Sequence, residues 1–146
     1  MEHKILFVDD EQNVLNAYRR NLRKCFDVHT ALSGTAAIEL LKEKHKFAVV
    51  VCDMQMPNMN GIEFLEIAQK ISKNSIRIML TGNVDQQTAI DAINQGDIFR
   101  FINKPCTPDQ MMEALKVALK QYLLITAEQE LLKTTLKNPL KCLLKS

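Results

Sequence analysis

Short apolar segments alternate with amphipathic segments along the whole chain. The apolar segments cover residues 4–8, 26–30, 47–52, 76–80 and 98–102. Between them, apolar residues recur at helical spacing, as at Leu15, Tyr18 and Leu22. The apolar segments are continuous rather than alternating, which is typical of parallel strands that helices cover on both faces. The pattern therefore predicts an α/β fold, a doubly wound (βα)5 sheet of five parallel strands.

The last predicted helix is longer than the sheet domain requires. It should begin with Thr107 as its N-cap and Pro108 in its first position. A heptad then runs through Leu115, Ala118, Tyr122, Ile125, Gln129, Leu132 and Leu136. One interpretation is a terminal helix folded back on the core; the other is a helix that projects from the domain by roughly 20 residues, about 30 Å. We favour the second, with a domain over residues 1–122 and an interaction or linker helix over 123–146.

Composition and charge argue against several classes of function. The chain has 146 residues, 47% of them hydrophobic and 25% charged, so we expect one compact domain. A formal net charge of +2 does not indicate nucleic-acid binding. Because there is neither a membrane-length apolar run nor a secretory signal, we expect a cytoplasmic protein without a membrane partner. The four cysteines are widely spaced, which favours reduced thiols over disulfides or a zinc site.

Polar side chains follow four of the five predicted strands. They stand in Asp9-Asp10-Glu11, Asp53, Thr81-Gly82 and Asn103-Lys104-Pro105. The carboxyl ends of parallel strands meet at one edge of such a sheet, where ligands bind. Converging carboxylates repel one another by about 4 kcal/mol per pair at 4 Å, unless a cation lies among them or one takes up a proton. An all-oxygen ligand set without His or Cys favours Mg²⁺ over zinc.

An aspartate beside a metal, a hydroxyl and a lysine can accept a phosphoryl group. The carboxylate forms an acyl phosphate, while the cations and the hydroxyl stabilise charge on the transferred group. No general base is aimed at a separate substrate, so the protein itself is the plausible acceptor. A purely structural interpretation stands beside this one, in which Asp9, Asp10 and Glu11 only cap the following helix.

The separated motifs together resemble the receiver domain of two-component response regulators. They are Asp9-Asp10, the stretch from Asp53 to Gly61 (Asp-Met-Gln-Met-Pro-Asn-Met-Asn-Gly), Thr81-Gly82 and Lys104-Pro105. The resemblance covers about residues 3 to 120, with the motifs in the family's order. It implies the flavodoxin-like receiver fold and a phosphoprotein that signals, rather than an enzyme.

The resemblance also implies a role for each matching residue. Asp53 would accept a phosphoryl group from a phosphohistidine of a sensor histidine kinase or a phosphotransfer protein. Asp10, Asp53 and the backbone carbonyl of Gln55 would bind Mg²⁺, and Asp9 would act largely through metal-bound water. Lys104 would pair with the phosphoryl group.

Two further residues would convert phosphorylation into a change of shape. Thr81 would move its hydroxyl onto the phosphoryl group, and the motion would be coupled to Phe101, three residues before the lysine. Phe101 lacks the hydroxyl of the commoner tyrosine, so we expect steric coupling only. The Lys104-Pro105 bond should be cis, as it usually is in the family. The responding surface would lie near 85–95, 98–102 and the last helix, where partners and dimer mates dock.

The stretch 98–105 and the tail 126–136 look similar to receivers joined to HD-GYP-type cyclic-dinucleotide phosphodiesterases. We therefore expect the chain to be a piece cut within a linker, with an output domain absent from it. The C-terminal helix can also serve as a homodimer contact. Two other function classes stay open: a Mg²⁺-dependent phosphatase or phosphotransferase with Asp53 as its nucleophile, and an interaction module indifferent to phosphate.

Overall fold

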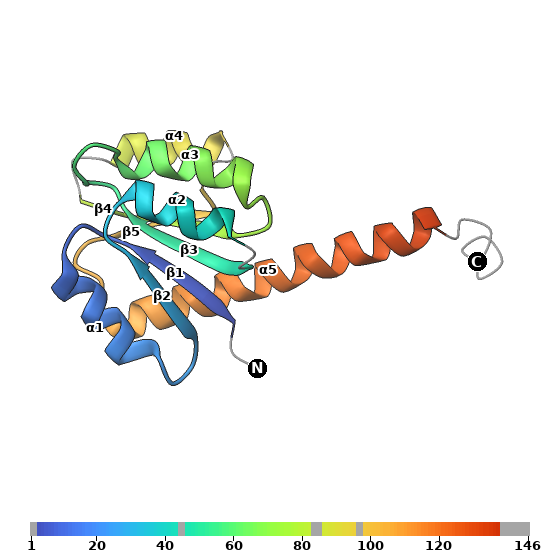
Figure 1. Ribbon diagram of the computed structural model, residues 1–146, viewed down its shortest axis with the longest axis horizontal. Coiled ribbons are helices and arrows are strands. Elements are labelled where there is room, and N and C mark those ends of the chain that lie inside the picture. The colour runs from blue at the N-terminus through green and yellow to red at the C-terminus, as the bar shows by residue number, and fades with distance from the viewer. Residues whose placement is uncertain (1–2, 44–45, 83–85, 96–97, 138–146) are drawn as a thin grey trace.

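The computed structural model describes residues 3–43, 46–82, 86–95 and 98–137, and five strands alternate with five helices along them. Figure 1 shows their arrangement. The strands are β1 (Lys4–Val8), β2 (Asp27–Ala31), β3 (Phe47–Asp53), β4 (Ile76–Thr81) and β5 (Arg100–Asn103). The helices are α1 (Gln12–Leu22), α2 (Gly34–Lys42), α3 (Gly61–Ile71), α4 (Gln86–Asn94) and α5 (Pro108–Lys137).

The five strands form one parallel sheet in the order β2-β1-β3-β4-β5. Helices α2, α3 and α4 cover one face, and α1 and α5 cover the other (Figure 1). A helix on each side of the sheet is the arrangement that right-handed crossovers between parallel strands produce. The predicted (βα)5 doubly wound fold is confirmed.

The continuous apolar strands are explained by the two helical layers. In β1, Ile5 and Phe7 join the core under α1 and α5, while Leu6 and Val8 join the core under α2, α3 and α4. Successive side chains of a strand point to opposite faces, so a strand between two helical layers must be apolar at every position. The central strand β3 is accordingly buried along its full length.

The strand ends differ slightly from the predicted ones, and two of the differences bring a predicted site residue into a strand. β3 includes Asp53 and β4 includes Thr81, one residue beyond each apolar run. The ladder continues because backbone groups pair whatever the side chain is: the Met54 amide donates to the Leu80 carbonyl at 2.9 Å, and the Lys104 amide to the Thr81 carbonyl at 2.9 Å. The ladder thereby holds the polar side chains on rigid strand ends.

Helix α5 is one continuous element of 30 residues, and it begins as expected. Thr107 caps it: the Thr107 hydroxyl accepts from the Gln110 amide at 3.1 Å, and the Gln110 side chain accepts from the Thr107 amide at 2.9 Å. This reciprocal pair is a capping box, which satisfies two amides that the first helical turn leaves unpaired. The sequence thus fixes the start of α5 by local hydrogen bonding.

The heptad residues of α5 are buried in the first part of the helix and more exposed in the second. Leu115 and Ala118 are fully buried under the sheet, and Tyr122 and Ile125 pack at the border of the same core. Two side-chain hydrogen bonds of 2.8 Å, donated in opposite directions, then join Gln129 to Asn74 in the turn before β4.

Beyond this contact, Leu132 and Leu136 are exposed and α5 leaves the domain (Figure 1). The extended C-terminal helix is confirmed, and its contacts with the domain continue as far as Gln129. Residues 138–146 of the predicted extension lie outside the described residues, so its length of about 20 residues stays a prediction. The boundary between residues 122 and 123 stays a prediction. No helix among the described residues combines the length and the apolarity that crossing a bilayer demands.

Candidate functional site

The predicted site residues stand at the carboxyl edge of four neighbouring strands. Asp9 follows β1, Asp53 ends β3, Thr81 ends β4, and Lys104 follows β5. The order β1-β3-β4-β5 makes these strand ends consecutive along the edge. The sheet alone therefore brings together residues that are up to 95 positions apart in the sequence.

Three carboxylates converge at this edge. One oxygen from each of Asp9, Asp10 and Asp53 lies within 4.8 Å of the other two. Asp9 and Asp53 are 4% and 5% exposed, while Asp10 is open to solvent. The Lys104 ammonium forms an ion pair with the Asp53 carboxylate, and 43% of the lysine side chain is exposed to solvent. One lysine thus faces a cluster that carries up to three negative charges.

The electrostatics of this cluster favour a cation. Burial raises the pKa of Asp9 to about 6, and the negative charge of Asp53 adds to the rise. A hydrogen bond of 2.9 Å from the Glu11 amide to the Asp9 carboxylate opposes this effect, as does the charge of Lys104. A divalent cation that binds between the three carboxylates would stabilise their ionised forms. The oxygen donor set fits a hard ion such as Mg²⁺.

The Thr81 hydroxyl is hydrogen-bonded to the neighbouring backbone. Thr81 is fully buried, and its hydroxyl donates to the Gly82 carbonyl at 3.1 Å. Phe101 lies on β5 opposite Met79 and is partly buried against the core beneath α4. Thr81 thus stands at the same sheet edge as the three carboxylates. Phe101 lies within β5, the strand that precedes Lys104. The Lys104-Pro105 bond is cis, as expected.

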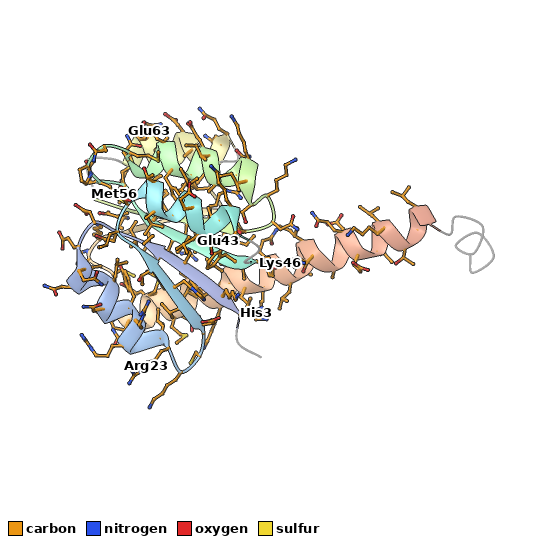
Figure 2. The ribbon with its side chains drawn as sticks, in the orientation of Figure 1. His3, Arg23, Glu43, Lys46, Met56 and Glu63 are labelled. Carbon is orange, nitrogen blue, oxygen red and sulfur yellow. The ribbon has the colours of Figure 1, made fainter. Side chains whose placement is uncertain are left out.

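The loop after β3 is fixed close to Asp53. Asn58 adopts a positive φ of 69°, a conformation that asparagine tolerates better than most residues. Asn60 and Glu63, the latter labelled in Figure 2, form a capping box at the start of α3. The Gly61 amide donates to the Met54 carbonyl at 2.9 Å. Gln55 lies in this loop with an exposed side chain. Its carbonyl as a metal ligand stays a prediction.

A pocket of about 460 Å³ opens beside the carboxylates. Asp9, Asp53 and Lys104 line it, together with Tyr18 from α1 and Cys106 from the segment before α5. The sequence interpretation missed the last two. Tyr18 was counted as an apolar position of a helix, and a cysteine isolated in sequence carries no motif. Only the neighbouring Lys104-Pro105 motif could have drawn attention to Cys106.

The comparisons with known proteins agree with this site. The family model of the response regulator receiver domain matches residues 5–116. The hydrogenase transcriptional regulatory protein HoxA of Bradyrhizobium diazoefficiens is 34% identical over 118 residues, which are 81% of this chain and 24% of HoxA. The chain thus spans about a quarter of the length of the HoxA relatives that it matches.

Two solved structures match this chain over most of their own length. A crystal structure described as adenylate cyclase from Rhodopirellula baltica is 44% identical, with a TM-score of 0.89 over 91% of this chain and 98% of the other. The signal receiver domain of an HD domain-containing protein from Pseudomonas fluorescens is 28% identical, with a TM-score of 0.77 over 88% of this chain and 93% of that one.

The family match covers every strand and the beginning of α5, and the acidic edge of the sheet lies within it. A likeness to a receiver from an HD domain-containing protein is also in keeping with the resemblance drawn from the sequence. The chain belongs to the response regulator receiver domain family of two-component signalling systems.

Proposed function

We propose that this receiver accepts a phosphoryl group on Asp53. The observation that carries the proposal is the pairing of a buried Asp53 carboxylate with Lys104 inside a pocket that Asp9 and Asp10 also border. A carboxylate oxygen of Asp53 attacks phosphorus and forms an acyl phosphate, while the bond from phosphorus to the donor's imidazole nitrogen breaks and its electron pair stays on that nitrogen. Lys104 then transfers its ion pair from the carboxylate to the phosphoryl oxygens.

Mg²⁺ is the cofactor that the donor set fits. Asp9, Asp10 and Asp53 would hold it, with the Gln55 carbonyl as a further ligand, and when bound it neutralises charge on the phosphoryl oxygens. Asp9 and Asp10 do no covalent chemistry in this scheme. They fix the cation beside Asp53, and the cation offsets the repulsion among the three carboxylates.

The switch requires Thr81 to change partner. Its hydroxyl leaves the Gly82 carbonyl and donates to the new phosphoryl group, and the space vacated beside β4 lets Phe101 move inward. The exposed residues Ile90, Phe99 and Val117 would change their surroundings as α4, β5 and α5 adjust. To move this surface from mostly inactive to mostly active, phosphorylation must favour the active form by roughly 5.5 kcal/mol.

The partners in this proposal follow from the chemistry. The donor is a histidine kinase or a phosphotransfer protein, because a phosphoramidate releases its group to a carboxylate. The exposed leucines of α5, among them Leu124, Leu131 and Leu132, provide a homodimer contact or a connection to an output domain. The output stays undefined; the relative described as an adenylate cyclase and the one from an HD domain-containing protein are two precedents. A cytoplasmic location remains the expectation from the sequence.

Intact mass after incubation with Mg²⁺ and acetyl phosphate tests the proposal. The wild-type chain should gain one phosphoryl group, and Asp53→Asn should gain none. Addition of a chelator should reduce uptake by the wild type, since the carboxylates then lack their cation. Uptake by Asp53→Asn at the wild-type rate would refute Asp53 as the acceptor. Repeated turnover of a small phosphoester would instead favour an enzyme.

A further inference from the structure

Tyr18 projects from α1 onto the wall of the phosphorylation pocket. Its ring is stacked on Phe7 of β1, with centroids 4.5 Å apart and ring planes at 19°. Phe7 is 1% exposed and lies two residues before Asp9. A ring stacked on a rigid core residue has a fixed direction. Tyr18 is therefore held in one orientation at the border between the core and the pocket.

The hydroxyl of Tyr18 is an available hydrogen-bond donor. Burial raises its pKa, and the negative charges of Asp9 and Asp53 raise it further, so the phenol keeps its proton at neutral pH. Among the residues that the structure describes, none forms a hydrogen bond with this hydroxyl. A neutral O–H without a protein partner lies beside a pocket whose other charged groups are mainly anionic.

Among the described residues that line this pocket, the neutral side chains other than Tyr18 include no strong hydrogen-bond donor. Val14, Leu80 and Pro105 line it with apolar side chains, and the thiol of Cys106 is a weak donor. A phosphoryl group brings three oxygens, each able to accept more than one hydrogen bond. Lys104, Thr81 and a divalent cation do not saturate these oxygens. These oxygens can accept a further hydrogen bond, and the phenol lines the same pocket as Asp53.

We propose that Tyr18 is a phosphoryl-binding residue, whose hydroxyl donates a hydrogen bond to the phosphoryl group on Asp53. This inference rests on the proposed function, because it needs Asp53 to carry the group. It adds a contact that the motif residues do not include. The competing interpretation makes Tyr18 a packing residue only, whose ring supports Phe7 while its hydroxyl contacts water.

The two tyrosines of the chain provide an internal control. Tyr122 lies on α5 and lines a separate hollow with Lys70, Lys73 and Asn74; its ring is 6.3 Å from that of His3. With tyrosine labelled by ¹³C at Cζ, each phenol gives one resonance that responds to hydrogen bonding. Titration with beryllofluoride and Mg²⁺, a mimic of the phosphoryl group, should move the Tyr18 resonance and leave that of Tyr122 in place.

Affinity measurements separate the hydroxyl from the ring. Tyr18→Phe keeps the stacked ring, and its affinity for beryllofluoride should fall roughly two- to tenfold, the usual effect of one lost hydrogen bond. Tyr122→Phe should bind as the wild type does. Equal affinity of Tyr18→Phe and wild type, together with an unmoved Tyr18 resonance, would overturn the inference while leaving the proposed function intact. If wild type binds no beryllofluoride and takes up no phosphoryl group, both are overturned.

Discussion

Gly61 packs against the backbone that carries the proposed phosphoacceptor. A Cβ atom at this position would lie 2.6 Å from the Asp53 carbonyl oxygen and 2.9 Å from the Met54 Cα. Both are backbone atoms of β3 and its following loop, so neither can rotate out of the way. Gly61→Ala must therefore push α3 away from the end of β3 by most of an ångström, since ordinary contacts begin at 3.4 Å.

The expected effect follows from two opposing contributions. Overpacking a rigid site costs about 1–3 kcal/mol. Alanine also restricts the unfolded chain, which returns roughly 0.4–1 kcal/mol. We expect a net loss of about 1–2 kcal/mol in the free energy of unfolding, or a fall in Tm of about 2–8 °C for a chain of this size. Displacement of Asp53 from Lys104 should also slow phosphorylation by something on the order of tenfold.

Urea unfolding and the rate of phosphorylation by acetyl phosphate measure the two effects. Two other glycines serve as controls. A Cβ at Gly82, beside the same site, meets nothing within 4 Å. At Gly34 it would lie 2.6 Å from the Met59 sulfur, the far end of a flexible side chain that can move. Both alanine variants should stay within about 0.5 kcal/mol of the wild type. If Gly61→Ala matches Gly82→Ala in stability and rate, the packing argument is wrong.

Three further experiments test other parts of the site and the helix. Lys104→Met should slow phosphoryl uptake by about 10²–10³-fold, as loss of one electrostatic stabiliser commonly does, while Mg²⁺ affinity persists; an unchanged rate would exclude the lysine from the chemistry. Saturating Mg²⁺ at about 100 times its Kd should stabilise the wild type by roughly 2.7 kcal/mol in thermal unfolding, and Asp10→Asn should need more Mg²⁺ for the same gain; equal titrations of the two proteins would argue against Asp10 as a ligand. Asn74→Ala and Gln129→Ala should each destabilise by about 0.5–1.5 kcal/mol, with the double variant no worse than either; additive losses would mean that the paired amides do not act together.

The strands β1, β3 and β4 could be predicted from the sequence because their burial is nearly uniform. A run such as that from Ile5 to Val8 is apolar at every position, and only a strand between two helical layers requires this. The exact ends of the strands were harder to predict from the sequence. Asp53 and Thr81 interrupt the apolar pattern, yet both belong to strands because their neighbours' backbone groups continue the ladder.

The heptad pattern correctly predicted the helix α5. It did not show which residues of the protein the helix packs against. Apolar residues at this spacing fit equally well against the chain's own sheet or against another helix. Only the packed structure shows that Leu115, Ala118, Tyr122 and Ile125 face the sheet. It also shows that Gln129 bonds to Asn74 and that exposed leucines follow.

The sequence by itself determined the order of the elements, the two-sided burial of the sheet and the identity of the acidic, hydroxyl and lysine residues at four strand ends. Tertiary structure alone decided how these groups face one another and that Tyr18 joins them. The reason is physical: periodicity reports which side of an element is buried, whereas the distance between side chains on different elements depends on how those elements pack.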